Sequence, residues 1–287
     1  MNNINRIVLG TAQFQSGYGI SNKKTIDPFK ILNFAKKHKI KFLDTSPLYG
    51  KGENIIGNAN LKFDIISKIP KIKNRRMNAQ KWVIENTKKT LKNLKQKSIY
   101  AMLVHHASDL KGEHGNSLFA GLKIIKKQKK VKKIGVSIYS FDDLDWILKR
   151  FKFDIVQLPF NLFDQRLVNK KWLIKLKKKN IEIHCRSIFL QGLLLKKYKL
   201  PIKLNIIEKK ISEFHKWAKI KNIKPINAAL SFILKYKNID KLIIGVNNYK
   251  QLKEIIENLR INKLQIPKKF VINEEKLINP ALWPKKL

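Results

Sequence analysis

Four polar residues at the ends of β-rich runs could carry acid–base chemistry. The stretch FLDTSPLYGKGENIIG (42–57) begins like a buried strand and places Asp44 and Tyr49 at its end and just beyond it. Lys68 and His105 end two later runs in the same way. Taken singly, each residue has an ordinary structural explanation. The aspartate could stabilise a turn, the lysine could be one of many surface lysines, the tyrosine could lie at the rim with its hydroxyl in water, and the histidine could be hydrogen-bonded within the fold.

Together, these four residues suit proton transfer to a carbonyl oxygen. An ammonium group stabilises a nearby phenolate, so Lys68 is expected to lower the pKa of Tyr49 from its usual value of about 10. Asp44 would pair with the lysine and keep it charged, and His105 would orient the carbonyl group. The sequence does not predict a metal site, because the single cysteine and six scattered histidines lack the spacing of metal ligands.

The elements that position these residues follow a regular rhythm of short β-rich runs and longer amphipathic stretches. The predicted strands are 6–10, 40–44, 64–68, 99–105, 132–137, 154–158, 181–185 and 241–246. The predicted helices begin near Pro28, Asn54, Asn78, Asn116, Asp142, Val168, Leu204 and Tyr249, with a further helical segment from Pro225. Asp27 before Pro28 is a good helix start, and Ser140 is a plausible N-cap with Asp143 three residues later.

Eight alternating units predict an α/β fold of the (β/α)8 TIM-barrel type. A single domain would span 1–287, with a C-terminal tail from about residue 259 packing on the barrel. An open doubly wound sheet is the alternative, but the turn GTAQFQSGYG after the first strand lacks the G-x-G-x-x-G spacing. In such barrels chemistry gathers at the C-terminal ends of the strands, which would bring the four polar residues onto one rim.

Composition limits the classes of partner. The 287 residues carry a net charge of +42, which raises the possibility of a nucleic-acid or membrane-surface role. Only seven of the 62 basic residues are arginine, and the lysines are spread over nearly every predicted helix, so no specific nucleic-acid partner is expected.

The N-terminus lacks a signal-like apolar run, and no stretch approaches the roughly 20 apolar residues of a membrane span. With its lone Cys185, the sequence is typical of a cytoplasmic protein.

Ordered motifs along nearly the whole chain resemble those of the aldo-keto reductases, a family of NAD(P)-dependent barrel enzymes. GTAQFQSGYGISN is similar to the family's first strand and loop, and FLDTSPLYGKGENIIG to its D-T-A-x-x-Y-G signature. IISKIP and MLVHHASDL resemble the strands that carry the catalytic lysine and histidine. KKIGVSIYS and DIVQLPFNLFDQR resemble the strands that hold the nicotinamide, and IEIHCRSIFLQGLLL and IIGVNNYKQLKEII the segments around the pyrophosphate and adenosine.

The resemblance implies a role for each matching residue. Tyr49 would be the general acid in reduction and the base in oxidation, with Lys68 and Asp44 tuning it and His105 positioning the carbonyl; the rival for His105 is His106. The implied cofactor contacts are Gly10, Thr11, Ala12 and Asp44 near the first strands, Ser137 and Gln157 at the carboxamide, Arg186 at the nicotinamide, Ser187, Leu190 and Gly192 at the pyrophosphate, and Gly245, Val246, Asn247, Asn248, Gln251 and Glu254 at the adenosine.

Several positions depart from the family pattern. Ser137 is followed by Ile138 where the family often has Ser-Asn, so one carboxamide contact is missing or replaced. Arg186 stands where an aromatic residue often stacks on the nicotinamide, although a guanidinium can also stack on a ring. Where Lys or Arg often meets the 2′-phosphate, the chain has two asparagines, and Lys250 or Lys253 would have to substitute. The resemblance favours NADPH as cofactor, but because of these two asparagines NADH stays open.

These observations predict an NAD(P)H-dependent reductase of an aldehyde or ketone, with a sugar-like carbonyl among the candidates. The segments after His105 and after the last helix are short, which predicts an open pocket, and Phe14, Tyr18, Phe160 and Trp283 are candidate pocket aromatics. A nucleotide-sensing barrel with slow turnover and, from charge alone, a polyanion-binding protein are the alternatives. The sequence leaves the substrate and the oligomeric state open.

Overall fold

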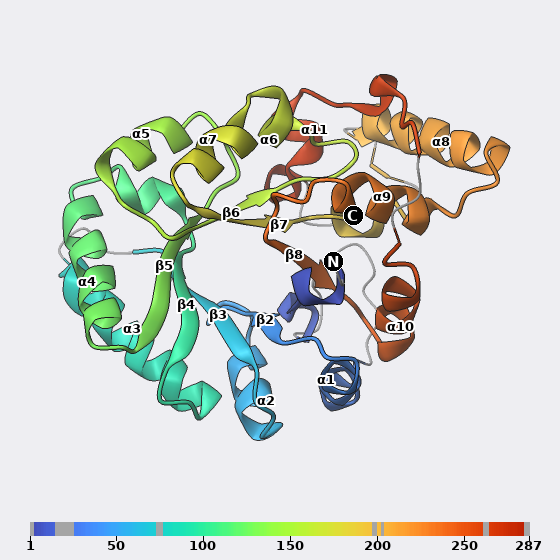
Figure 1. The fold of residues 1–287 in the computed structure, drawn as a ribbon. Coiled ribbons are helices and arrows are strands. Elements are labelled where there is room, and N and C mark those ends of the chain that lie inside the picture. The colour runs from blue at the N-terminus through green and yellow to red at the C-terminus, as the bar shows by residue number, and fades with distance from the viewer. Residues whose placement is uncertain are drawn as a thin grey trace.

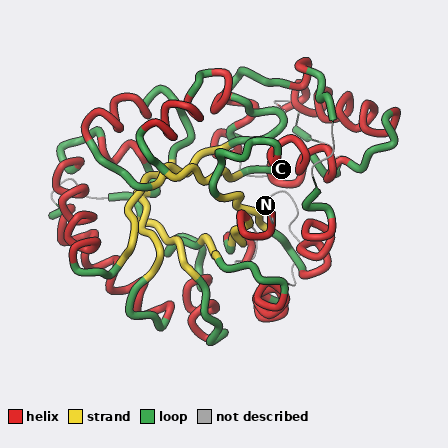
Figure 2. The backbone as a smooth tube through the Cα atoms, viewed as in Figure 1, coloured by secondary structure: helices red, strands yellow, loops and turns green. Residues whose placement is uncertain are grey.

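The fold was analysed in a computed structural model that describes residues 3–14, 26–72, 77–196, 200–201, 204–260 and 264–283. Eight parallel strands close into a barrel in sequence order, and the helices surround it (Figures 1 and 2). The predicted (β/α)8 fold is confirmed. The strands are β1 (Ile7–Gly10), β2 (Phe42–Asp44), β3 (Asp64–Ile69), β4 (Ile99–Val104), β5 (Val131–Ser137), β6 (Ile155–Pro159), β7 (Glu182–Arg186) and β8 (Lys241–Gly245).

The barrel closes where β1 pairs with β8, with Gly10 opposite Gly245. On its other side β1 pairs with β2, which sets Gly10 opposite Asp44. The predicted runs agree with the observed strands to within two residues, because each strand is short, β-branched and bounded by turn residues. The C-terminal ends of all eight strands therefore share one rim.

The helices occupy the connections between strands. They are α1 (Pro28–Lys37), α2 (Gly52–Asn58), α3 (Ala79–Leu94), α4 (Gly115–Lys127), α5 (Leu144–Arg150), α6 (Arg166–Asn169), α7 (Trp172–Lys178), α8 (Asn205–Ile220), α9 (Pro225–Leu234), α10 (Tyr249–Glu257) and α11 (Glu275–Ile278). The predicted start of α1 is confirmed, because Pro28 opens the helix and the Asp27 carboxylate accepts from the Lys30 N–H at 2.9 Å.

Two helix predictions need correction. Ser140 does not cap α5: that helix begins at Leu144 with Asp143 as its N-cap residue. The Ser140 hydroxyl instead accepts from the Asp142 N–H at 3.3 Å and stabilises the turn that precedes the helix. The single helix expected from Val168 is divided into α6 and α7, since Lys171 between them adopts a left-handed φ of 57°.

The core has two parts. A large apolar cluster fills the space between the sheet and the helices. A small cluster lies inside the barrel and consists of Val8, Ile66, Ala101, Leu103, Ile155 and Ile243. Because these side chains fill the middle of the barrel, the polar groups at its two ends belong to separate sites.

Two residues of the stretch 42–57 have packing roles. Glu53 on α2 is buried, and its carboxylate accepts from Ser67 on β3 at 2.9 Å and from Thr90 on α3 at 3.0 Å. A Cβ atom at Gly57 would lie 2.2 Å from the backbone oxygen of Asn93. Only glycine therefore lets α2 approach α3 this closely.

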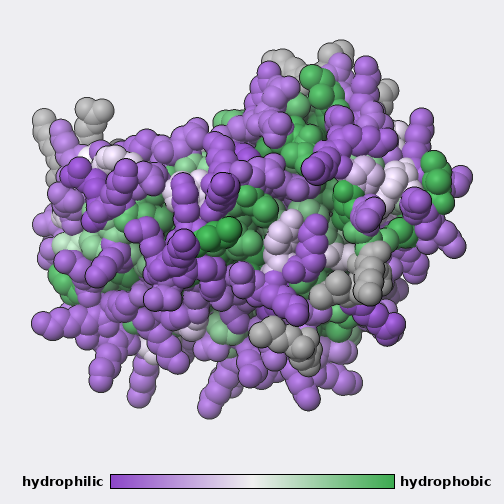
Figure 3. Space-filling view, turned by 45° about the horizontal axis from the view of Figure 1, so that its top comes forward, coloured by the Kyte–Doolittle hydropathy of each residue, from purple (hydrophilic) through white to green (hydrophobic). Residues whose placement is uncertain are grey.

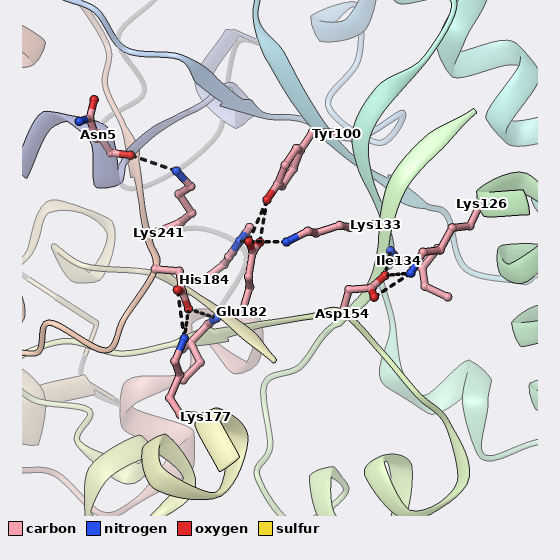
Figure 4. A network of polar contacts seen from close by, with 12 residues as sticks. Asn5, Tyr100, Lys126, Lys133, Ile134, Asp154, Lys177, Glu182, His184 and Lys241 are labelled. Atoms are coloured by element: carbon pink, nitrogen blue, oxygen red, sulfur yellow. Dashed lines mark hydrogen bonds and ion pairs between the residues drawn. The ribbon is translucent and has the colours of Figure 1, made fainter. Parts of the chain in front are cut away.

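A polar network occupies the N-terminal end of the barrel (Figure 4). Tyr100, Lys133 and His184 converge on the Glu182 carboxylate, with donor–acceptor distances of 2.9, 2.5 and 3.2 Å. Burial alone would raise the pKa of Glu182, but these hydrogen bonds and charges outweigh it and lower the pKa to about 2. The network stabilises the end of the barrel opposite the strand C-termini.

The C-terminal tail packs on the barrel with Phe270, Leu277 and Trp283 buried. The Ile272 N–H donates to the Phe163 carbonyl at 2.9 Å, which ties the tail to the loop after β6. Arg166 joins the same region through an ion pair with Glu275 at 3.2 Å.

The surface seen in Figure 3 is covered mainly by hydrophilic side chains, with apolar groups visible between them. This agrees with lysines that are spread over the helices rather than gathered in one place. Within the described ranges, no helix has both the length and the apolar character needed to cross a membrane.

Candidate active site

A cavity of about 940 Å³ opens at the C-terminal ends of the strands. Seven of the eight strands contribute a lining residue at or near the end of the strand, and the loop after β4 contributes another. These residues are Gly10, Asp44, Lys68, Ser137, Gln157, Arg186 and Gly245, with His105 directly after β4. A cavity of this size holds a small-molecule ligand of cofactor dimensions. The rim that topology predicted therefore lines a cavity.

The centre of the cavity is a buried ion pair. Lys68 Nζ donates to Asp44 Oδ1 at 2.6 Å and to the Thr45 carbonyl at 2.9 Å. The second carboxylate oxygen, Oδ2, accepts from Gln157 Nε2 at 2.7 Å. These contacts hold the lysine and the carboxylate in one orientation at the base of the cavity.

Gln157 links this ion pair to the strand predicted to hold the carboxamide. Its Oε1 lies 3.5 Å from the hydroxyl of Ser137, while its NH₂ group faces Asp44. The reversed amide orientation would put two acceptor oxygens face to face, so the carboxylate fixes the orientation of the amide. The sequence did not predict this connection between the two groups of residues.

Tyr49 and His105 lie together above the ion pair. Lys68 Nζ is 5.2 Å from the centroid of the Tyr49 ring, and the Tyr49 and His105 rings meet edge to face at 6.2 Å. His105 Nδ1 lies 3.3 Å from the Ser46 hydroxyl. All four residues selected from the sequence therefore line one cavity.

The expected direction of the Tyr49 pKa shift is wrong. Burial of the phenol, the largest effect, raises its pKa above the usual value, and the charge of Asp44 raises it further. Arg186 acts in the opposite direction but does not prevail. The charge of Lys68, which was expected to lower the pKa, is paired with Asp44 at 2.6 Å and does not prevail over burial. The phenol is consequently a fully protonated donor at neutral pH.

His105, and not His106, lines the cavity. Burial is the main reason why the pKa of His105 falls to about 2, and the charges of Lys68, His106 and Arg186 lower it further. The imidazole is therefore neutral at physiological pH and can donate one N–H to a ligand.

Most of the predicted cofactor residues line the same cavity. Those that do are Gly10, Ala12, Asp44, Ser137, Gln157, Arg186, Ser187, Gly192, Gly245, Val246, Asn247, Asn248, Gln251 and Glu254. Thr11 and Leu190 do not. The Thr11 hydroxyl donates to the Asp44 carbonyl at 3.1 Å and is fully buried, and the Leu190 side chain is buried in the core.

The loop after β7 carries unusual backbone geometry. Ser187, Leu190 and Gln191 have left-handed φ values of 59°, 45° and 54°, and Gly192 has a φ of 92°. Such conformations are costly for residues with a side chain and cluster at ligand-binding sites. The pyrophosphate segment implied by the resemblance coincides with this strained loop.

Two further features of the cavity fit a dinucleotide. A Cβ atom at Gly10 would lie 3.2 Å from the Ile243 side chain, so at the end of β1 only glycine lets the cavity wall form without a shift of its neighbours. Gln13 packs against Gly245, and its buried Oε1 has no hydrogen-bond partner among the described residues. A buried acceptor without a donor indicates a polar ligand group at that position.

Sequence reasoning missed several lining residues. They are Gln13, Tyr139, Gln191, Lys196 and Lys224, all in loops that follow strands or at a helix start. Their positions in the sequence could have identified them, because residues just beyond the strand ends of such a barrel face the rim.

The candidate pocket aromatics Phe14, Phe160 and Trp283 are buried and do not line the cavity, and Tyr18 lies outside the described residues. In the part of the chain that the structure describes, no three metal-binding side chains come together.

The comparisons with known proteins agree with this geometry. The family model of the aldo/keto reductases matches residues 6–273. The chain belongs to the aldo-keto reductase family. Membership makes it an oxidoreductase that acts on carbonyl compounds, in a family that uses nicotinamide cofactors. No curated protein sequence matches this aldo-keto reductase.

Solved structures share the fold at low identity. The holo form of aldo-keto reductase AKR11C1 from Bacillus halodurans is 15% identical, with a TM-score of 0.73 over 91% of this chain and 88% of that chain. The glycerol dehydrogenase AKR11B4 from Gluconobacter oxydans is 18% identical, with a TM-score of 0.69 over 96% and 91% of the two chains. The likeness extends over almost the whole barrel.

Proposed function

We propose that this aldo-keto reductase reduces an aldehyde or ketone with NADPH and that Tyr49 donates the proton. The observation that carries the proposal is the convergence of Tyr49, His105 and the Asp44–Lys68 pair on one cavity at the strand C-termini. In a carbonyl reduction the oxygen must gain a proton as the carbon gains a hydride, and a protonated phenol beside a neutral imidazole suits that task.

The residues would divide the reaction between them. His105 donates an N–H to the carbonyl oxygen and holds it beside Tyr49. Tyr49 passes its proton to that oxygen as negative charge develops there. The Lys68 ammonium, 5.2 Å from the phenol ring, then stabilises the phenolate until a proton returns from solvent. A bound reduced nicotinamide supplies the hydride.

The cofactor would lie along the rim from β1 to β8. Gly10 lines the cavity at the end of β1, and Ser137 and Gln157 line it where they would meet the carboxamide. The loop after β7, with Ser187 and Gly192, would hold the pyrophosphate.

Lys250 supports NADPH over NADH. It lies in the first turn of α10 and lines the cavity, whereas Lys253 does not line it and pairs with Glu257 at 3.8 Å. The N-terminus of a helix attracts phosphate groups, and a lysine in its first turn adds a full charge. Lys250 is thus the residue best placed to recognise a 2′-phosphate.

Cofactor titration followed by a carbonyl panel tests the proposal. Quenching of tryptophan fluorescence gives the dissociation constants of NADPH and NADH, and cofactor absorbance then reports turnover of added aldehydes and ketones. Tight NADPH binding with turnover supports the proposal. Binding without turnover across the panel favours a nucleotide-sensing barrel, and absence of cofactor binding contradicts both.

A further inference from the structure

Arg186 places an uncompensated positive charge in the catalytic part of the cavity. Lys68 is paired with Asp44, and both Tyr49 and His105 are neutral, so these four groups carry no net charge. The contacts of Arg186 are all with neutral groups: among the described residues, no carboxylate lies within ion-pair distance of it. The catalytic end therefore carries one net positive charge.

The position of the guanidinium is fixed. It stacks on the Tyr139 ring at 3.7 Å and donates to the Ile138 carbonyl at 2.8 Å and to the Ser187 hydroxyl at 3.3 Å. Both Arg186 and Tyr139 are half-buried and line the cavity. Because a guanidinium has five N–H donors and these contacts use two, donors remain for a ligand.

Arg186 is also close to the reacting groups. It lines the same cavity as Tyr49 and His105, and its charge lowers the pKa of both groups. A group bound by Arg186 would therefore belong to the molecule whose carbonyl lies between Tyr49 and His105.

We propose that the carbonyl substrate carries an anionic oxygen group, a carboxylate or a phosphate, and that Arg186 binds this group. The inference rests on the proposed function, because it names the substrate class of the same site. The planar fork of a preoriented guanidinium matches a carboxylate or phosphate in two parallel hydrogen bonds.

A second possible role of Arg186 is stacking on the nicotinamide ring. One face of the guanidinium is already covered by Tyr139. The oxidised nicotinamide is itself a cation, so the remaining face would repel it. The affinity of an Arg186 variant for NADPH distinguishes the two roles. It should fall if Arg186 stacks on the nicotinamide and stay unchanged if Arg186 binds the substrate.

A pair of aldehydes that differ mainly in charge tests the proposal. With NADPH present, 4-carboxybenzaldehyde is compared with 4-formylbenzamide, its neutral counterpart of nearly equal shape. The wild type should favour the carboxylate in kcat/KM by about tenfold to a hundredfold, mainly through KM. Arg186→Gln should remove this preference, and Arg186→Lys should restore part of it.

Arg150 provides the matched control. It is exposed on α5 and lies over the Trp146 ring at 5.1 Å, outside the cavity, so Arg150→Gln should leave the preference unchanged.

A second pair of substrates, glyceraldehyde 3-phosphate and glyceraldehyde, tests whether the site prefers a phosphate to a neutral group, as the first pair does for a carboxylate. Equal kcat/KM for charged and neutral partners in both pairs would overturn the proposal. So would an Arg186→Gln variant that weakens NADPH binding and leaves the preference intact.

A binding measurement separates this inference from the proposed function. If no aldehyde is turned over, the dissociation constants of benzoate and benzamide are measured by tryptophan fluorescence on the NADPH-loaded protein. Tighter binding of benzoate that is lost in Arg186→Gln upholds the anion site without the reductase. Equal binding of the two ligands rejects the anion site.

Discussion

Lys68→Met should destabilise the protein strongly, because it leaves a buried carboxylate without its partner. Lys68 and Asp44 are 2% and 4% exposed, and their charged atoms are 2.6 Å apart. Removing one member of a buried pair costs about 3–5 kcal/mol, since the other charge stays desolvated. For a chain of this length the melting temperature should fall by roughly 5–8 °C.

Urea unfolding of three variants checks this value. Lys149→Met removes an ion pair of similar length, 2.7 Å, whose side chains are 75% and 54% exposed, so its unfolding free energy should match that of the wild type. Adding Asp44→Leu to Lys68→Met should recover part of the loss, because the orphaned charge is gone.

An unfolding free energy of Lys68→Met within about 1 kcal/mol of the wild type would refute the reasoning. So would equal losses for Lys68→Met and Lys149→Met, since the argument depends on burial and not on the ion-pair distance.

Three further predictions concern other parts of the molecule. Glu182→Gln should cost about 2 kcal/mol at pH 7, after allowance for partial exposure to water. Because the folded pKa of Glu182 is lowered to about 2 from 4.5, its contribution is complete above pH 4.5 and lost towards pH 2. Denaturation at pH 7 and pH 3 should therefore show the gap between variant and wild type falling to about half or less. Gly57→Ala should destabilise by about 1–3 kcal/mol through the clash with Asn93, whereas Gly112→Ala, with open space around it, should not. Lys250→Ala should weaken NADPH binding about tenfold and leave NADH binding unchanged, with Lys253→Ala as the control; an equal effect on both cofactors would contradict a 2′-phosphate contact.

The architecture could be predicted from sequence because it depends on local periodicity. Each strand is a short β-branched run, and the alternation with amphipathic helices determines a parallel barrel. Once the barrel is known, topology alone places Asp44, Lys68 and His105 on one rim, since they end or follow adjacent strands. These predictions needed no side-chain coordinates.

Features that depend on burial depth or side-chain rotamers could not be predicted. The direction of the Tyr49 pKa shift depends on how deeply the phenol is desolvated and on the compensation of Lys68 by Asp44. The hydrogen bond from Gln157 to Asp44 joins residues 113 positions apart. Neither the depth of a side chain nor the rotamer of an amide is encoded in residue spacing.

The stack of Arg186 on Tyr139 was missed for a different reason. Arg186 stood out as a departure from the family pattern, but its partner Tyr139 lies in the loop after another strand and had no predicted role. The Ser140 cap failed because a serine can stabilise a turn as easily as a helix start, and local sequence does not decide between them.

Turnover by Tyr49→Phe is the most direct test of the account. The substitution removes the hydroxyl that would supply the proton and keeps the ring that packs against His105. General acid catalysis contributes a factor of about 10²–10⁴, so kcat for a good aldehyde substrate should fall by at least that range while the dissociation constant of NADPH stays unchanged. Turnover within tenfold of the wild type, with normal cofactor binding, would contradict the role of Tyr49 as the proton donor.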